Sequence, residues 1–326
     1  MSRKGRPGQV AAMMSFAMVA AACGGSDGSS AADTITLYTC VSDTTIRPVI
    51  ETFEEDNPGT TVDLYRATTG ELNARVAADV RSGGLRADVV WACDPPTMQD
   101  YVDQGLVGGW TPTTEIDVEY RTDDYVGVAL LYLLAVSGPD VPAPEAWSDL
   151  AGPEYADGVA LPDPAVAASA LGALGWFAGD PDYGIGFYSA LRDNGAVQVS
   201  TPDDVVNGVA EGTYAAGITI ANSAYAAQGN GSPIEVTWPS PGAIGVYGPV
   251  ALATDARDSA IAKAFISYVV SEEGQTQMAG LGSYPTLAGV PGPEMPAGVE
   301  VVSPDWSEVS AQREDLLREY QKIFGG

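Results

Sequence analysis

Thr68, Thr69 and Gly70 have the residue types and spacing to bind an anion. They follow a strand predicted over 61–65, and apolar residues then recur at helical spacing, so a helix begins at this turn. The first turn of a helix has amide N–H groups without intrahelical partners and positive partial charge, which threonine hydroxyls can supplement. The competing interpretation is an ordinary helix cap, with Glu71 in the first turn. The turn by itself leaves both interpretations open.

A second anion-binding helix start is predicted in the segment PDPAVAASALGALGWF. A helix that begins after Pro164 would offer the amides of residues 165–167, with the hydroxyl of Ser169 nearby. Such a site would face the first one across a cleft. An ordinary Ala-rich core helix explains the same residues and remains the alternative.

Strands and helices alternate between residues 34 and 94, and this alternation positions the candidate groups. Strand, helix, strand, helix and strand within about 60 residues predict parallel pairing with right-handed crossovers. Ligands of such sheets bind beyond the carboxyl ends of the strands. The loops 40–44, 68–71 and 93–96 all lie at that edge. They add Ser42, Asp43 and Asp94 to the candidate ligand-binding residues.

Two apolar runs, over 125–137 and 244–253, are too short to span a bilayer and are predicted as strands that cross between two lobes. Residues 34–128 are therefore assigned to lobe 1 and residues 129–245 to lobe 2. Residues 246–326 return to lobe 1 and end in helices that pack across both lobes. A buried strand over 215–221 delivers Asn222, Ser223 and Tyr225 to the cleft, and the return strand carries Tyr247.

Composition excludes several classes of function. The chain has 43 acidic and 15 basic residues and a net charge of −28, so its surface repels nucleic acid and anionic lipid. It contains no histidine, which removes Ser-His-Asp and Cys-His catalysis and the commonest transition-metal ligand. A secreted hydrolase that works with two carboxylates remains as a remote alternative, but no motif supports it. We expect neither an enzyme nor a cofactor.

The amino terminus is typical of an export signal. Arg3, Lys4 and Arg6 precede an apolar run over 10–22 of about a dozen residues, short of the roughly 20 that a spanning helix needs. The sequence Ala-Ala-Ala-Cys that ends at Cys23 resembles a bacterial lipoprotein cleavage box. It predicts a signal peptide over 1–22, lipidation of Cys23 and a flexible tether over 23–33, which place a membrane-anchored domain outside the cytoplasm.

Cys40 and Cys93 follow two strands that are predicted to be neighbours in one sheet. In an oxidising compartment this placement favours a disulfide between them. Two free thiols at the edge of the cleft are the alternative.

The order of several motifs resembles the extracellular solute-binding proteins of ABC importers, particularly the branch that binds ferric iron, phosphonates or phospho-sugars. The motifs are ITLYT, ATTGELNARVAAD, ADVVWACD, WPSPGAIGVYGPVAL, AKAFISYVVSEEGQ and SYPTL, and they cover essentially all of the mature chain. The resemblance implies a two-lobed α/β fold of the type II periplasmic binding proteins, in which a mainly parallel sheet flanked by helices forms each lobe and two strands form the hinge. It also implies a monomer that binds a small-molecule solute and delivers it to an ABC permease.

The ligand is where the sequence departs from the iron-binding branch. That branch binds iron with two adjacent tyrosines, a histidine and a carboxylate. At the place of the tyrosine pair this chain has a single tyrosine, Tyr225, and it has Ser42 near the place of the histidine and Asp94 near that of the carboxylate. A hard trivalent cation prefers several anionic oxygen ligands, so an organic anion such as a phosphonate, phosphate ester or carboxylate is the first hypothesis. Ferric iron held by Tyr225 and Asp94 is the second. A sensor that uses the same cleft without transport is a further alternative.

Overall fold

The computed structural model describes residues 33–325. The predicted signal peptide, Cys23 and the tether, apart from Asp33, lie outside the described residues. Within residues 33–325 no helix combines the length and the apolarity that crossing a bilayer requires.

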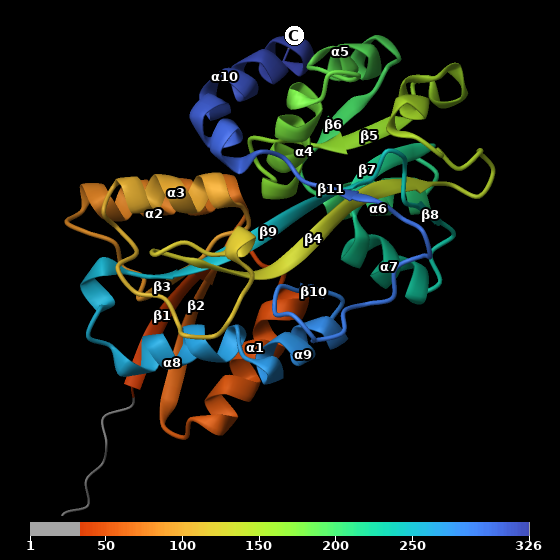
Figure 1. The fold of residues 1–326 in the computed structure, drawn as a ribbon. Coiled ribbons are helices and arrows are strands. Elements are labelled where there is room, and N and C mark those ends of the chain that lie inside the picture. Colours follow the sequence, from red (N-terminus) through yellow and green to blue (C-terminus); the bar gives the residue numbers. More distant parts are fainter. Residues whose placement is uncertain (1–32, 326) are drawn as a thin grey trace, which may run out of the picture. The chain divides into compact units, whose positions relative to one another are not determined.

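The described chain forms one mixed sheet flanked by helices (Figure 1). The strands are β1 (Asp33–Thr39), β2 (Thr60–Arg66), β3 (Val89–Trp91), β4 (Val126–Ser137), β5 (Val159–Pro162), β6 (Val197–Val199), β7 (Ala216–Ile220), β8 (Glu235–Thr237), β9 (Ala243–Leu252), β10 (Tyr284–Pro285) and β11 (Val301–Val302). Their order is β2-β1-β3-β9-β4-β7-β5-β6, while β8 and β10 pair with β4 and β11 pairs with β9.

The two ends of the sheet are parallel and its centre is antiparallel. Strand β1 pairs in parallel with β2 and β3, and β5 pairs in parallel with β6 and β7, as the alternation of strands and helices predicts. Strands β9 and β4 lie side by side between these two groups and run antiparallel to each other and to their outer neighbours. These are the two predicted crossing strands, and every residue of β9 is buried.

The helices are α1 (Asp43–Asp56), α2 (Thr69–Arg81), α3 (Pro95–Asp103), α4 (Ala168–Gly179), α5 (Gly186–Asp193), α6 (Pro202–Ala210), α7 (Ala221–Gly229), α8 (Ala260–Val269), α9 (Glu272–Gly280) and α10 (Trp306–Phe324). Their apolar stripes face the sheet, as Ile46, Val49, Ile50 and Phe53 do in α1. Pro48 is the sixth residue of α1, beyond its first turn, so the helix includes it at the loss of one backbone hydrogen bond.

Each half of the sheet, on either side of the central β9–β4 pair, has its own hydrophobic clusters. Two clusters draw on β1, β3 and on helices α1, α2, α3 and α8. The other two draw on β5, β7 and on helices α4 to α7 and α10. Helix α10 packs Tyr320 into one of these clusters and also contacts α3, where Arg313 pairs with Asp100. The lobe boundaries assigned from the sequence remain a prediction.

Candidate functional site

A cavity of about 340 Å³ lies where the carboxyl ends of β1, β2, β3 and β7 meet the central strands. This is the edge that the parallel topology selects for a ligand. Hydroxyl groups dominate its polar surface. They belong to Ser42, Thr44, Thr45, Thr68, Thr69, Ser169, Thr201, Ser223 and Ser283.

Five helices, α1, α2, α4, α6 and α7, begin at the wall of this cavity, because residues of the first turn or the N-cap of each helix line it. The helix starts come from both groups of strands: α1 and α2 follow β1 and β2, and α7 follows β7. Each start contributes first-turn amides and the positive end of a helix dipole. The wall therefore favours a negatively charged group.

Helix α2 is capped by its own side chains. The hydroxyl of Thr68 accepts the backbone N–H of Glu71 at 3.4 Å, and the Glu71 carboxylate accepts the backbone N–H of Thr68 at 3.1 Å. These two bonds form a capping box, and the bonds to Thr68 lower the pKa of Glu71. The helix cap considered from the sequence is therefore present, although Thr68 and Thr69 also line the cavity.

Helix α4 begins later than the sequence predicts, at Ala168 rather than after Pro164. Asp163 takes the amides of residues 165–167, because its carboxylate accepts from Ala165 and its carbonyl accepts from the next two residues. The predicted site on those amides is wrong. The first-turn amides without intrahelical partners are those of residues 168–170, and the N-cap residue Ala167 has no side-chain group to bind them.

Helices α1 and α7 also begin without a side-chain cap. Their N-cap residues, Ser42 and Ile220, make no side-chain hydrogen bond to the first turn. The Ser42 hydroxyl instead lies 3.0 Å from that of Thr44 and 3.1 Å from that of Thr45, so three hydroxyls cluster at the start of α1. In α7, Asn222 and Ser223 line the cavity. Three of the five helix starts therefore have no side-chain cap on their first-turn amides.

Arg66 and Asp203 are the charged side chains in the lining. Arg66 ends β2, and its Nε donates to the carbonyl of Val41 at 3.1 Å, which holds the side chain over the loop before α1. Asp203 lies in the first turn of α6. Neither residue is among those predicted from the sequence, although a basic residue at the carboxyl end of a predicted parallel strand is a usable signal.

The structure brings together six of the predicted ligand-binding residues. Those that line the cavity are Ser42, Thr68, Thr69, Ser169, Asn222 and Ser223. Ser169 is 4% exposed, so its hydroxyl reaches the cavity from an otherwise buried position. The amide oxygen of Asn222 is buried and has no hydrogen-bond partner among the described residues.

Three other predicted residues, Asp43, Gly70 and Glu71, lie at helix starts but do not line the cavity. Asp43 pairs with Arg47 on the exposed side of α1 at 2.8 Å, and Glu71 is held in the capping box. Gly70 does allow a close approach, but the group that approaches is protein. A Cβ atom built on Gly70 would lie 3.1 Å from the carbonyl oxygen of Ala165.

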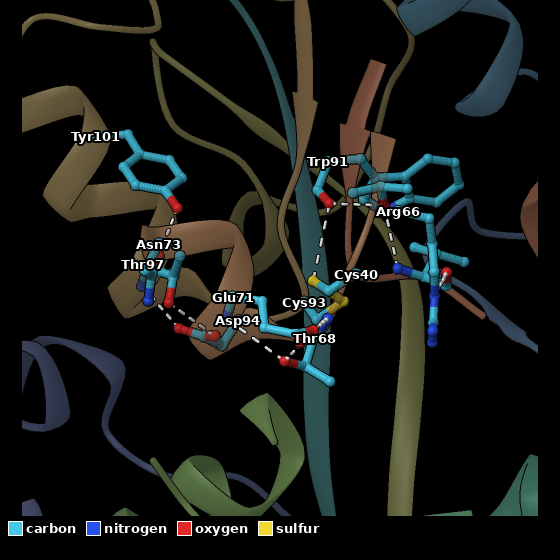
Figure 2. Close-up of a disulfide and its surroundings, with 12 residues drawn as sticks. Cys40, Arg66, Thr68, Glu71, Asn73, Trp91, Cys93, Asp94, Thr97 and Tyr101 are labelled. Atoms are coloured by element: carbon cyan, nitrogen blue, oxygen red, sulfur yellow. Dashed lines mark hydrogen bonds between the residues drawn. A yellow bond between two sulfur atoms is a disulfide. The ribbon is translucent and has the colours of Figure 1, made fainter. Parts of the chain in front are cut away.

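Asp94 lies outside the lining of the cavity. It is fully buried and caps α3, where its carboxylate accepts the amide of Thr97 at 2.7 Å and the hydroxyl at 3.0 Å (Figure 2). Burial raises the pKa of this carboxyl, against the opposing effect of Arg313. Its contacts are those of a structural cap.

Tyr225 and Tyr247 also lie outside the lining. The Tyr225 hydroxyl accepts from Trp238 Nε1 at 2.8 Å. Tyr247 is 5% exposed, and its ring packs edge-on against Tyr120 and Trp306. Burial raises the pKa of Tyr247, which keeps its hydroxyl neutral.

Cys40 and Cys93 form a disulfide, as predicted, with their Cα atoms 6.0 Å apart. The bond joins the loop that leads into α1 to the loop that leads into α3 (Figure 2). Both cysteines line the cavity. The disulfide therefore forms part of the cavity wall.

Comparisons with known proteins agree with this geometry. A family model described as bacterial extracellular solute-binding protein matches residues 35–282. A comparison with curated proteins found no match.

Solved structures share the fold at low identity. The periplasmic binding protein AfuA from Actinobacillus pleuropneumoniae, with exogenous fructose-6-phosphate bound, has a TM-score of 0.80 at 18% identity, and the match covers 90% of this chain and 99% of AfuA. Apo ferric ion-binding protein A from Pasteurella haemolytica has a TM-score of 0.76 at 19% identity, with coverage of 90% and 98%. The substrate-binding protein of an ABC transporter from Agrobacterium tumefaciens has a TM-score of 0.80 at 15% identity, with coverage of 91% and 95%.

These structures confirm the type II periplasmic-binding-protein fold that the sequence resemblance implies. The family model spans well over half of the chain and coincides with the strands and helices that build the cavity. On this ground, the protein belongs to the bacterial extracellular solute-binding protein family, whose members bind solutes for ABC importers.

Proposed function

We propose that the solute is a small organic anion, such as a phosphonate, a phosphate ester or a carboxylate, and that the protein delivers it to an ABC permease. The observation that carries this proposal is the convergence of five helix starts on one cavity, three of them without side-chain caps. Unpaired amides and helix dipoles in a partly enclosed site bind anions without a metal ion. Arg66, the only basic residue of the lining, adds a charged donor.

The acidic exterior does not prevent an anion from binding. A net charge of −28 repels anions at long range, but physiological salt screens that repulsion beyond about 8 Å. Inside the cavity the amides, the hydroxyls and Arg66 lie at contact distance from the ligand. The local donors therefore decide the affinity, whereas the exterior slows association.

Ferric iron remains the second candidate because four of the similar structures are ferric binding proteins by name, including those from Campylobacter jejuni and Bordetella. Two observations favour the organic anion. Tyr225 and Asp94, the predicted iron ligands, lie outside the cavity lining, and that lining contains a single carboxylate, Asp203, and no tyrosine. The same single carboxylate argues against a glycoside hydrolase, which needs a pair.

A thermal-shift panel tests the proposed function. A ligand at 100 times its Kd stabilises the folded protein by about 2.7 kcal/mol, so phosphonates, phosphate esters or carboxylates are expected to raise the melting temperature by several degrees. Ferric ion with a synergistic anion is the comparison arm. A rise with ferric ion alone, and none with the organic anions, would replace the proposed ligand class.

The charge of Arg66 is expected to account for part of the affinity. Arg66→Met keeps an unbranched apolar stem and removes a hydrogen bond to a charged ligand, a change of about 1.5–3 kcal/mol, so affinity should fall about 10- to 100-fold in calorimetric titrations. Arg47→Met is the matched control, because Arg47 pairs with Asp43 outside the cavity. Equal affinities of the two variants would contradict the role of Arg66.

The cellular setting completes the proposal. A lipid anchor at Cys23 and a flexible tether over 23–33 would keep a monomeric binding domain near the permease, with residues 34–128 and 246–326 forming one lobe and residues 129–245 the other. A sensor that uses the same cleft is the competing role. Genes for a permease and an ATPase beside this one would favour import, and a neighbouring receptor kinase gene would favour sensing.

A further inference from the structure

The cavity has apolar walls between its polar helix starts. We infer that the solute is an organic anion with an apolar body, such as a short alkyl or aryl chain, and lacks the many hydroxyl groups of a sugar. This inference rests on the proposed function, because the anionic head is the group assigned to the helix starts.

Leu131 is the first observation. It lies in the middle of β4, is only partly buried, and lines the cavity. Its neighbours Leu130 and Leu133 pack in hydrophobic clusters, whereas Leu131 belongs to none of the clusters formed by the described residues. The exposed apolar surface of Leu131 contributes free energy only when another apolar group covers it. An apolar group of the ligand is the best explanation for a leucine in this position.

The rest of the cavity wall between the helix starts is also apolar. Strand β4 adds Ala129 next to Leu131, and other elements add Val166, Ile220, Met278 and Leu281. These side chains offer dispersion contacts and no hydrogen bonds.

Partners for a polyhydroxylated body are concentrated at the helix starts, where eight of the nine lining hydroxyl groups lie, and not on the apolar wall. The lining contains one carboxylate, Asp203, and one side-chain amide, Asn222. Both of these residues also lie in the first turns of helices, Asp203 in α6 and Asn222 in α7. A sugar that displaced water from the apolar wall would leave hydroxyl groups without partners.

The size of the cavity also indicates a ligand with an organic body in addition to its anionic head. Its volume is about 340 Å³, and a single water needs only about 10–15 Å³ of such space. An oxyanion head alone would leave most of the cavity unfilled. The remaining volume next to Leu131 is available to the organic body.

An alkylphosphonate series tests the inference on the purified protein. Methyl-, ethyl-, propyl- and butylphosphonate are titrated by calorimetry, and each added methylene that is buried should raise the affinity about fourfold. 2-Hydroxyethylphosphonate, which replaces the terminal methyl of the propyl compound with a hydroxyl, should bind about tenfold more weakly than propylphosphonate.

Two leucine variants provide the matched comparison. Leu131→Ser should reduce the ratio of butyl to methyl affinity from about 60-fold to less than about 10-fold, whereas Leu130→Ser, on the opposite face of β4, should preserve the ratio. The circular-dichroism melting curve of each variant confirms folding, and the wild-type series stands as a test even if a variant does not fold.

The outcomes separate this inference from the proposed function. An affinity that stays flat along the series, or tighter binding of the hydroxyethyl compound, overturns the apolar body while the organic-anion function stands. Absence of binding by every phosphonate, phosphate ester and carboxylate overturns the function itself and the inference with it.

Discussion

Replacing Ala167 with Asp should lower the affinity for the organic anion by at least about 100-fold and at the same time raise the stability of the ligand-free protein. Ala167 is the N-cap residue of α4, has extended backbone angles, and lines the cavity. An Asp at this position would accept the free first-turn amides, which contributes about 0.5–2 kcal/mol to stability. The same carboxylate would occupy the donors that the ligand uses. It would also place a like charge about 4 Å from the ligand, which costs about 4 kcal/mol at an effective dielectric constant of about 20.

Ala167→Asn is the matched control because it caps the helix without a charge. We expect it to stabilise the free protein to a similar degree and to reduce affinity much less than Asp does. Calorimetric titration with a ligand from the thermal-shift panel measures affinity, and scanning calorimetry measures stability. Binding by the Asp variant within about threefold of wild type would show that the start of α4 does not contact the anion.

Loss of the disulfide is expected to produce the largest change in stability. The bond closes a loop with a sequence separation of 53, and the chain-entropy relation then gives about 4 kcal/mol for its removal. The double variant Cys40→Ser with Cys93→Ser should therefore unfold about 6 °C below wild type. Because both cysteines line the cavity, the variant should also bind the anion more weakly.

Reductant provides the control for this prediction. Dithiothreitol should lower the unfolding midpoint of the wild-type protein toward that of the double variant, and it should leave the double variant unchanged. Equal effects of reductant on the two proteins, or a difference in free energy of unfolding below about 1 kcal/mol, would show that the bond contributes little to stability.

Local sequence predicts the elements of this fold well. The apolar runs over 125–137 and 244–253 coincide with β4 and β9, and the helix cap considered at Thr68 forms a capping box in α2. These features depend on periodicity and on contacts between residues a few positions apart, both of which can be read from the chain. Neighbouring parallel strands also explain why the pairing of Cys40 with Cys93 could be anticipated.

The direction of individual side chains could not be read in this way. Asn222 and Ser223 face the cavity, whereas Tyr225 turns toward Trp238, because successive residues of α7 point in different directions around the helix axis. Asp94 follows a strand at the correct edge, yet its carboxylate is taken by Thr97. Arg66 and Asp203 are far apart in the sequence and meet at one cavity only through the order of the strands.

The sequence alone determined the α/β class, the two long central strands, the edge of the sheet at which the cavity lies and the family resemblance, because each follows from local patterns and from the handedness of crossovers. Tertiary structure decided which helix starts keep free amides. A start is a local event, but its donors remain available only if no nearby group accepts them. In α2 the Thr68 hydroxyl takes the amide of Glu71, and Asp163 takes the amides of residues 165–167. The starts of α1, α4 and α7 have no side-chain cap, and the packing of the sheet brings them to one cavity.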